Sequence, residues 1–119
     1  MQYLLLIYRS EAENAKMSEA QLGAMSKEYL DFTQGIVASG HYRAGDALQP
    51  TRTATTVRVR DGKTLTTDGP FAETKEQLGG YYLVEAKDLD EVIRLAARIP
   101  NARNGSVEVR PIRPIPRAS

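Results

Sequence analysis

The sequence contains no cysteine, and it has one histidine in 119 residues. The lack of cysteine excludes disulfides, thiolate nucleophiles, iron–sulfur clusters and thiolate zinc sites. With one histidine, a metal ion would need mostly carboxylate ligands, so we expect neither a metal nor another cofactor. No apolar run approaches the roughly 20 residues of a membrane-spanning helix. The start, Met1–Tyr8, lacks the basic leader and cleavage site of a signal peptide, which predicts a cytoplasmic protein without a membrane partner.

Charge is balanced overall but uneven along the chain. The net charge of +1 does not indicate the excess of positive charge that is typical of nucleic-acid-binding proteins, so we expect no nucleic-acid partner. Acids outnumber bases five to two between Glu11 and Asp31, and six arginines face one glutamate from Arg94 onward. These runs indicate either solvated surfaces or, at the arginine-rich end, a rim that binds an anion or an acidic partner.

Two segments predict amphipathic helices. Ser18 and Gln21 form a capping-box pattern, because each side chain can satisfy a free backbone amide. An apolar stripe follows up to Gly40, which is expected to close the helix; it consists of Leu22, Met25, Tyr29, Phe32 and Ile36. Asp88 and Glu91 open a second helix that Pro100 ends, with a stripe of Leu89, Val92, Ile93, Ala96 and Ile99.

The remaining segments predict strands and turns. Short runs of apolar or β-branched residues predict strands over 2–8, 53–60, 63–67, 81–86 and 107–112. Asp61-Gly62 favours a tight hairpin turn of the primed type. An irregular segment is expected over 41–50, and a helical turn over 73–78. We therefore expect one domain over 1–112, followed by an extended tail over 113–119.

This order of elements predicts an α+β fold of the ferredoxin-like type, with a hairpin inserted in the middle and both helices on one face of an antiparallel sheet. Strands Tyr3–Tyr8 and Tyr81–Val84 are apolar on both faces, so the other face also needs cover. Leaving Leu4, Leu6 and Tyr82 in water would forgo roughly 1.5–3 kcal/mol each. We expect a homodimer packed sheet to sheet; the alternative is that the hairpin folds over this face within one subunit.

The most specialised segment is Asp68-Gly69-Pro70-Phe71-Ala72-Glu73-Thr74-Lys75-Glu76. Gly-Pro forces a bend, and four ionisable side chains lie within nine residues. Phe71 is expected to plug the core. Together with Leu78-Gly79-Gly80-Tyr81-Tyr82, the Asp88-Leu89-Asp90-Glu91 helix start and the closing Val107–Ile112, it resembles the DGPF-domain proteins of the YciI-like (YCII-related) family.

This resemblance covers Met1 to Ile112 and implies a dimeric α+β barrel in a bacterial cytoplasmic protein. It also implies an association with an extracytoplasmic-function sigma factor, whereas it names no substrate. Family members with a known arrangement pair a histidine of the first helix with an aspartate. The helix predicted here over Ser18–Ser39 has no histidine, so only the aspartate carries over, onto Asp68.

Asp68 is the leading candidate for proton transfer, because a carboxylate beside a cleft acts as a general acid or base if burial raises its pKa. The alternative is a turn cap whose oxygens accept from the following amides. Glu73 or Glu76 is expected to join Asp68 as a catalytic carboxylate pair; otherwise they are solvated charges.

A second group of side chains is expected to bind the ligand: His41, Arg43, Arg58, Lys75 and Tyr82. His41 either gains stabilisation at the end of the first helix or reaches Asp68 as a proton shuttle. The arginines either hold an anion or stay exposed. Tyr82 either lines a pocket between the two subunits or fills the dimer interface.

These patterns predict a protein that binds a small molecule. If the protein is an enzyme, we expect acid–base chemistry of the isomerase or lyase type, with Asp68 as the proton-transfer group. Two alternatives remain open: a noncatalytic regulatory or sensor module that works with a sigma factor, and an interaction domain without a ligand.

Overall fold

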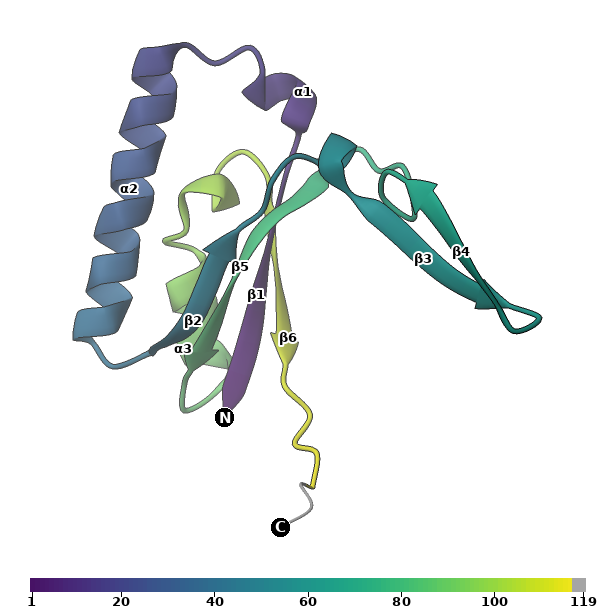
Figure 1. Ribbon diagram of the computed structural model, residues 1–119. Coiled ribbons are helices and arrows are strands. Elements are labelled where there is room, and N and C mark those ends of the chain that lie inside the picture. The colour runs from purple at the N-terminus through teal and green to yellow at the C-terminus, as the bar shows by residue number, and fades with distance from the viewer. Residues whose placement is uncertain (117–119) are drawn as a thin grey trace.

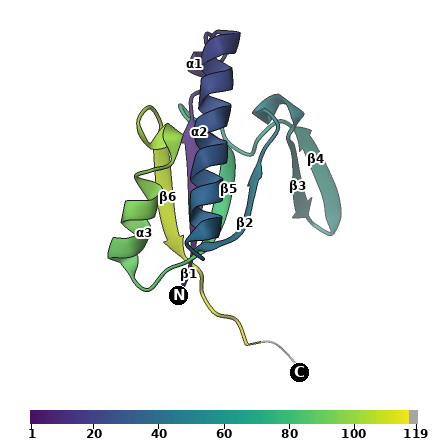
Figure 2. The ribbon, with the colours of Figure 1, turned by 90° about the vertical axis from the view of Figure 1, so that its left-hand side faces the viewer.

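The computed structural model describes residues 1–116 as a four-stranded antiparallel sheet with helices on one face, together with a two-stranded arm that stands away from it (Figure 1). The strand order is β2 (Tyr42–Ala47), β5 (Gln77–Glu85), β1 (Gln2–Arg9) and β6 (Ser106–Pro111). Helices α2 (Glu19–Ala38) and α3 (Leu89–Ala96) cover the same face (Figure 2). This is the predicted ferredoxin-like α+β sandwich.

The core lies between the sheet and these two helices. Alternate residues of β1 point toward the helices, and Tyr3, Leu5 and Ile7 are buried. Leu4 and Leu6 point to the uncovered face and stay partly exposed. We expected Tyr82 on that uncovered face, which was wrong: Tyr82 pairs with Leu5 and is buried on the helix side.

Helix α2 has both predicted ends. The Ser18 hydroxyl accepts from the Gln21 amide while the Gln21 side chain accepts from the Ser18 amide, which completes the capping box. At the other end Gly40 has a φ of +82°, and the His41 amide donates to the Ile36 carbonyl at 3.0 Å. This is a Schellman ending, which satisfies carbonyls that the last turn leaves free.

Helix α3 begins as predicted, because the Asp88 carboxylate accepts from the Glu91 amide at 2.9 Å. Its buried face is partly different. Val92, Ala96 and the following Ile99 are buried, but Leu89 and Ile93 are about half exposed and Leu95 is buried instead. The helix also ends at Ala96, one turn before Pro100. Short helical turns connect the larger elements: α1 (Glu11–Asn14), η1 (Thr51–Thr53) and η2 (Pro100–Ala102).

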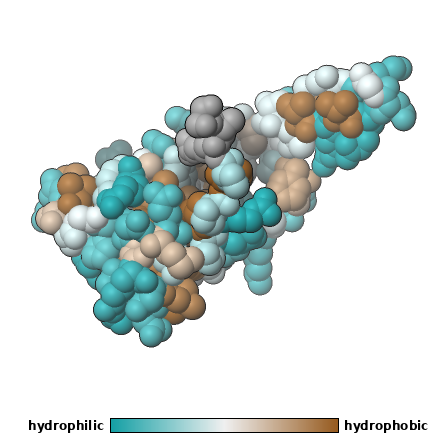
Figure 3. Space-filling view, turned by 90° about the horizontal axis from the view of Figure 1, so that it is seen from below, coloured by the Kyte–Doolittle hydropathy of each residue, from teal (hydrophilic) through white to brown (hydrophobic). Residues whose placement is uncertain are grey.

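The arm is the hairpin of β3 (Thr55–Arg60) and β4 (Lys63–Asp68), which pair only with each other. Asp61 and Gly62 have φ of 52° and 74°, as a type I′ turn requires. The arm does not fold over the bare face of the sheet, and its surface carries apolar side chains that project from the body (Figure 3): Val57, Val59 and Leu65. Within one subunit, the hairpin thus leaves the bare face uncovered.

Three local predictions were wrong. Residues 42–47 of the segment expected to be irregular form the edge strand β2, held by pairing with β5. No helical turn forms over 73–78; β5 begins at Gln77 instead. Phe71 does not plug the core, since 79% of it is exposed. Residues 113–116 have no regular structure, and the predicted tail beyond them lies outside the described residues.

Candidate functional site

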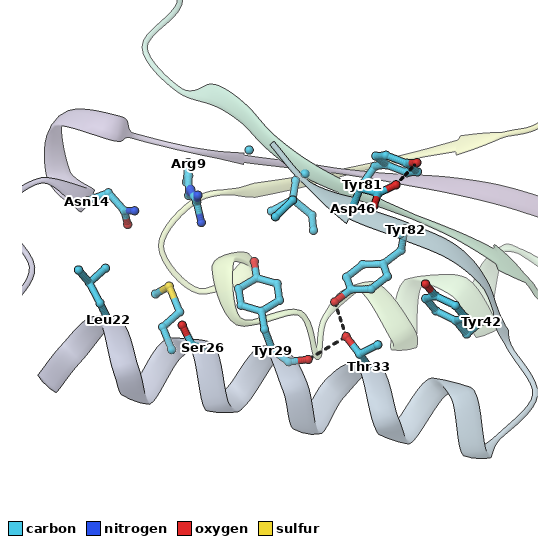
Figure 4. A pocket seen from close by; sticks show the side chains of 16 residues that line it. Arg9, Asn14, Leu22, Ser26, Tyr29, Thr33, Tyr42, Asp46, Tyr81 and Tyr82 are labelled. Carbon is cyan, nitrogen blue, oxygen red and sulfur yellow. Dashed lines mark hydrogen bonds between the residues drawn. The ribbon is translucent and has the colours of Figure 1, made fainter. Parts of the chain in front are cut away.

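A cavity of about 480 Å³ lies between α2 and the covered face of the sheet (Figure 4). The end of β1, β2 and the start of β5 form one wall, and α2 forms the other. Sites for small organic molecules commonly enclose about 300–1,000 Å³. Leu22, Met25 and Tyr29 of the predicted helix stripe line this cavity, and Tyr29 also packs against the core. The cavity therefore has the size and the partly apolar walls of a ligand site.

Glycines allow the sheet wall to form. A β-carbon on Gly45 would lie 2.7 Å from the ring of Tyr82, and one on Gly79 would lie 2.9 Å from Nε of Arg9. Neither distance is compatible with a real side chain unless its neighbour moves. The register of β1 and β5 also shifts next to Gly79, and such bulges commonly re-aim side chains beside functional sites. Gly79 thus gives the Arg9 side chain room to cross β5.

Arg9 is the cationic group of the cavity. It reaches from β1 toward α2 (Figure 4). Among residues 1–116 the ion pairs involve other side chains, and none neutralises Arg9. A guanidinium carries five N–H donors in a fork that fits a carboxylate or phosphate. An unpaired arginine, partly buried in a cavity, is therefore the strongest indication of an anionic ligand in this structure.

Hydrogen-bonded hydroxyl groups line the cavity from Tyr29, which lies next to Arg9, to Tyr82 at the far end (Figure 4). The Thr33 hydroxyl donates its one proton to the Tyr29 carbonyl at 2.8 Å. In its 2.6 Å contact with Tyr82, it must therefore accept, so the Tyr82 hydroxyl donates. The Tyr29 hydroxyl donates to Oδ1 of the buried Asn101 at 2.5 Å. Both phenol protons of Tyr29 and Tyr82 are thus used within the protein, which leaves oxygen lone pairs as acceptors.

These two phenols stay neutral. Burial raises the pKa of Tyr29 to about 12, against smaller lowering effects of Asn101 and Arg9. Burial also raises the pKa of Tyr82, while the Thr33 hydrogen bond acts in the opposite direction. Neither phenol therefore supplies a base near neutral pH. Asp46, which accepts from the Tyr81 hydroxyl at 2.7 Å, lies with Tyr81 on the far side of the strands from α2 (Figure 4).

A second cavity of about 410 Å³ adjoins the first and shares Arg9, Leu22 and Gly79 with it. Its outer wall is the segment that leads into the arm. There the Glu11 carboxylate accepts from the Thr51 amide at 2.9 Å and from the Thr51 hydroxyl at 2.6 Å. The hydroxyl hydrogen bond is the main cause that lowers the pKa of Glu11. The charge of Arg9 also lowers the pKa of Glu11, although the two side chains form no ion pair. Glu11 thus fixes the base of the arm and leaves the Arg9 N–H donors available to a ligand.

The carboxylates predicted as catalytic lie outside both cavities. Asp68 is exposed at the end of β4, and its turn is held by other groups: the Gly69 amide donates to the Ala54 carbonyl at 2.7 Å. Gly69 has a φ of +97°, which explains the glycine there. Glu73 is exposed, and Glu76 accepts from the Ser106 hydroxyl at 2.8 Å. Within one subunit, this segment and the cavity are separate features.

Of the residues predicted to bind a ligand, the structure brings one to the cavity, which is Tyr82. The Arg43 guanidinium donates to the carbonyls of Gly40 and Tyr42, both at 2.9 Å. Arg58 is exposed on the arm and Lys75 on the loop before β5. These four side chains come from different parts of the fold and do not converge.

His41 belongs to a hydrogen-bonded row at the end of α2. Its Nδ1 lies 2.6 Å from the Ser39 hydroxyl and its Nε2 lies 3.0 Å from Glu91 Oε1. His41 precedes β2, whereas Asp68 precedes the start of β5 at the opposite end of the sheet, so the two do not form a dyad (Figure 1). In this row the Ser39 hydroxyl also donates to the Ile36 carbonyl at 3.2 Å.

Sequence reasoning missed Arg9, Tyr29 and Thr33 as site residues. Arg9 directly follows the apolar run 3–8 and belongs to no motif, while Tyr29 fits the helix stripe. One signal was present: Gly79-Gly80 before a strand indicates close approach of another group. Which side chain approaches Gly79 follows only from the pairing of β1 with β5.

Two comparisons relate this chain to known proteins. A family model described as YCII-related domain matches residues 1–116. An uncharacterized protein of Rhizobium meliloti (strain 1021) is 37% identical over 114 residues, which is 94% of this chain and 92% of that protein. Among residues 1–116, no three His, Cys, Asp or Glu side chains gather as metal ligands. In the same range, no helix has the length and apolarity needed to cross a membrane.

Proposed function

This chain belongs to the YCII-related domain family, and from that premise we propose that it is a small-molecule-binding protein whose ligand occupies the cavity between α2 and the sheet. The single observation that carries the proposal is Arg9. Its guanidinium lies across Gly79 inside a cavity of suitable size, without an ion-pair partner among residues 1–116. Its N–H donors can therefore form charge-assisted hydrogen bonds with a ligand anion.

Replacing Gly79 by alanine tests the proposal. The new β-carbon would lie 2.9 Å from Arg9 Nε, so the flexible arginine must move while the fold persists. A metabolite screen by thermal shift first identifies a ligand; at 100 times its dissociation constant it should add about 2.7 kcal/mol to stability. We expect Gly79→Ala to bind this ligand at least about tenfold more weakly.

Gly23→Ala is the matched control, because nothing lies within 4 Å of its β-carbon on α2. It should bind the ligand as the original protein does. Equal affinity of Gly79→Ala and the original protein would contradict the proposed site, and so would a ligand that protects no residue of the cavity in hydrogen exchange.

We also propose that two copies pair through the bare face of the sheet. Leu4 and Leu6 lie on this face, where neither α2, α3 nor the arm covers them. The exposed apolar residues of the arm and the exposed Phe71 add surface that a second copy would cover. An isolated two-stranded hairpin is only marginally stable in water, so the arm also gains from a packing partner.

Sedimentation measures this pairing directly. The original protein should have a molecular mass of twice 13.2 kDa by sedimentation. The Leu6→Glu variant should have a mass of 13.2 kDa, because pairing would bury the charge of the glutamate in the interface. Val37→Glu places the same charge on an exposed apolar position of α2 and should leave the mass unchanged. A monomeric original protein would contradict the pairing.

An acid–base role of Asp68 depends on this pairing. The register of the hairpin puts Asp68 on the same face as Val57 and Val59, so a copy that covers these valines also approaches the carboxylate. Asp68 as the proton-transfer group, with Glu73 or Glu76 beside it, stays a prediction, as does association with a sigma factor.

A further inference from the structure

The cavity has two chemically different ends. At the β1 end, Arg9 offers only N–H donors. Farther along α2, Tyr29 lies between Arg9 and Tyr82, which is at the other end (Figure 4). The phenol oxygens of both tyrosines offer lone pairs, because Asn101 and Thr33 already take both phenol protons. The lining also includes the apolar side chains of Ile7, Leu22 and Met25.

The sheet register sets the span between these ends. Tyr82 pairs with Leu5, and Arg9 follows Leu5 by four residues on the same strand. Four residues of a strand cover about 13 Å. Since the Arg9 and Tyr82 side chains both extend from the sheet toward α2 (Figure 4), a small organic molecule needs a polar group near each end to engage both of them.

We infer that the ligand is a small organic anion, with its carboxylate or phosphate at Arg9 and a hydroxyl or amino hydrogen-bond donor at Tyr29 and Tyr82. This inference rests on the proposed function and names the ligand class for the same cavity. A ligand oxygen without a proton cannot form a hydrogen bond with these phenol oxygens, because both phenol protons are already donated within the protein. Such a mismatch leaves polar groups unpaired, which commonly discriminates more strongly than a change in apolar contact.

Tyr42 is the exception at this end. It lines the cavity, and no protein group among residues 1–116 takes its phenol proton. Its hydroxyl can rotate to donate or to accept, so it tolerates either kind of ligand group. The preference for a donor therefore comes from Tyr29 and Tyr82, and it should weaken when one of them loses its oxygen.

A small set of benzene derivatives tests both ends by calorimetry. 4-Hydroxybenzoate has an anion and a donor, 4-methoxybenzoate has the anion without the donor, and phenol has the donor without the anion. 4-Hydroxyphenyl phosphate replaces the carboxylate and separates the two anion classes. We expect at least one of the two hydroxylated anions to bind about tenfold or more tightly than either 4-methoxybenzoate or phenol.

Variants assign each half of the preference. Arg9→Met, or Gly79→Ala if Arg9→Met does not fold, should reduce binding of the hydroxylated anion to the level of phenol. Tyr82→Phe should bring it to the level of 4-methoxybenzoate. Gly23→Ala serves again as the control with nothing near its β-carbon.

Each contrary result overturns a defined statement. Equal affinity for 4-hydroxybenzoate and 4-methoxybenzoate would show that the ligand needs no hydrogen-bond donor. Phenol binding as tightly as the hydroxylated anions would show that it needs no anion at Arg9. If none of these probes binds while the metabolite screen yields a cavity ligand without an anion and a donor, the ligand class is wrong and the proposed function stands. If no compound of either set binds in the cavity, both are wrong.

Discussion

Replacing Leu5 by alanine is expected to lower the free energy of unfolding by about 2–5 kcal/mol, the usual cost of removing a fully buried leucine side chain. Leu5 is 0% exposed at the centre of β1, where it pairs with Tyr82 on β5 and Val109 on β6. These neighbours are held by two ladders of backbone hydrogen bonds, so they cannot easily collapse into the space that the side chain leaves. Urea unfolding followed by circular dichroism measures the loss.

Leu65→Ala removes the same atoms from an exposed position. Leu65 lies on the arm with 48% of its surface exposed, so its loss should change the free energy of unfolding of a monomeric subunit by less than about 0.5 kcal/mol. Similar losses for Leu5→Ala and Leu65→Ala would contradict the core described here. A loss at Leu65 that grows with protein concentration would instead show that a second copy covers the arm.

Replacing Asn101 by alanine is expected to cost about 1–3 kcal/mol, because it leaves the hydroxyl of the half-buried Tyr29 without a partner. Asn101 is 1% exposed, accepts from Tyr29 and donates to Asn104 at 2.9 Å. It therefore connects α2 to the segment between α3 and β6. The same change frees the Tyr29 proton, so the preference for a ligand donor should also weaken.

Asn104→Ala is the matched control, since Asn104 is exposed at the outer end of the same row and solvent can replace its hydrogen bond. It should change the free energy of unfolding by less than about 0.5 kcal/mol. If Asn101→Ala is equally harmless, the Tyr29 hydroxyl is not held as the structure has it, and the assignment of acceptors in the cavity loses its basis.

Local chemistry was sufficient to predict the helix ends and the hairpin turn. Ser18, Gly40 and Asp88 act on backbone groups within a few residues of themselves, so their effect is already contained in the local sequence. Asp61-Gly62 likewise determines its own turn through positive φ angles. The order of these elements then leaves few compact arrangements, and the ferredoxin-like fold is among them.

Predictions that depended on a distant neighbour failed. β2 has few apolar residues and becomes a strand because β5 pairs with it, while Gln77 and Leu78 join β5 through pairing with β1. Phe71 is a residue type that usually lies in the core, yet here it follows the arm and lies exposed, away from the core. In each case a partner far along the chain decided the outcome, and no local pattern identifies that partner.

The sequence by itself determined the fold class and the two main helices, because capping, apolar periodicity and turn chemistry all act over short distances; the family followed from the resemblance of its motifs. Only the tertiary structure decided where a ligand can bind. It separates Asp68 from His41, sets Arg9 across Gly79 and ties the protons of Tyr29 and Tyr82 to Asn101 and Thr33. The physical reason is that strand register and hydrogen bonds join residues far apart in the chain, such as Tyr29 and Asn101, which lie 72 positions apart, and these pairings define the cavity.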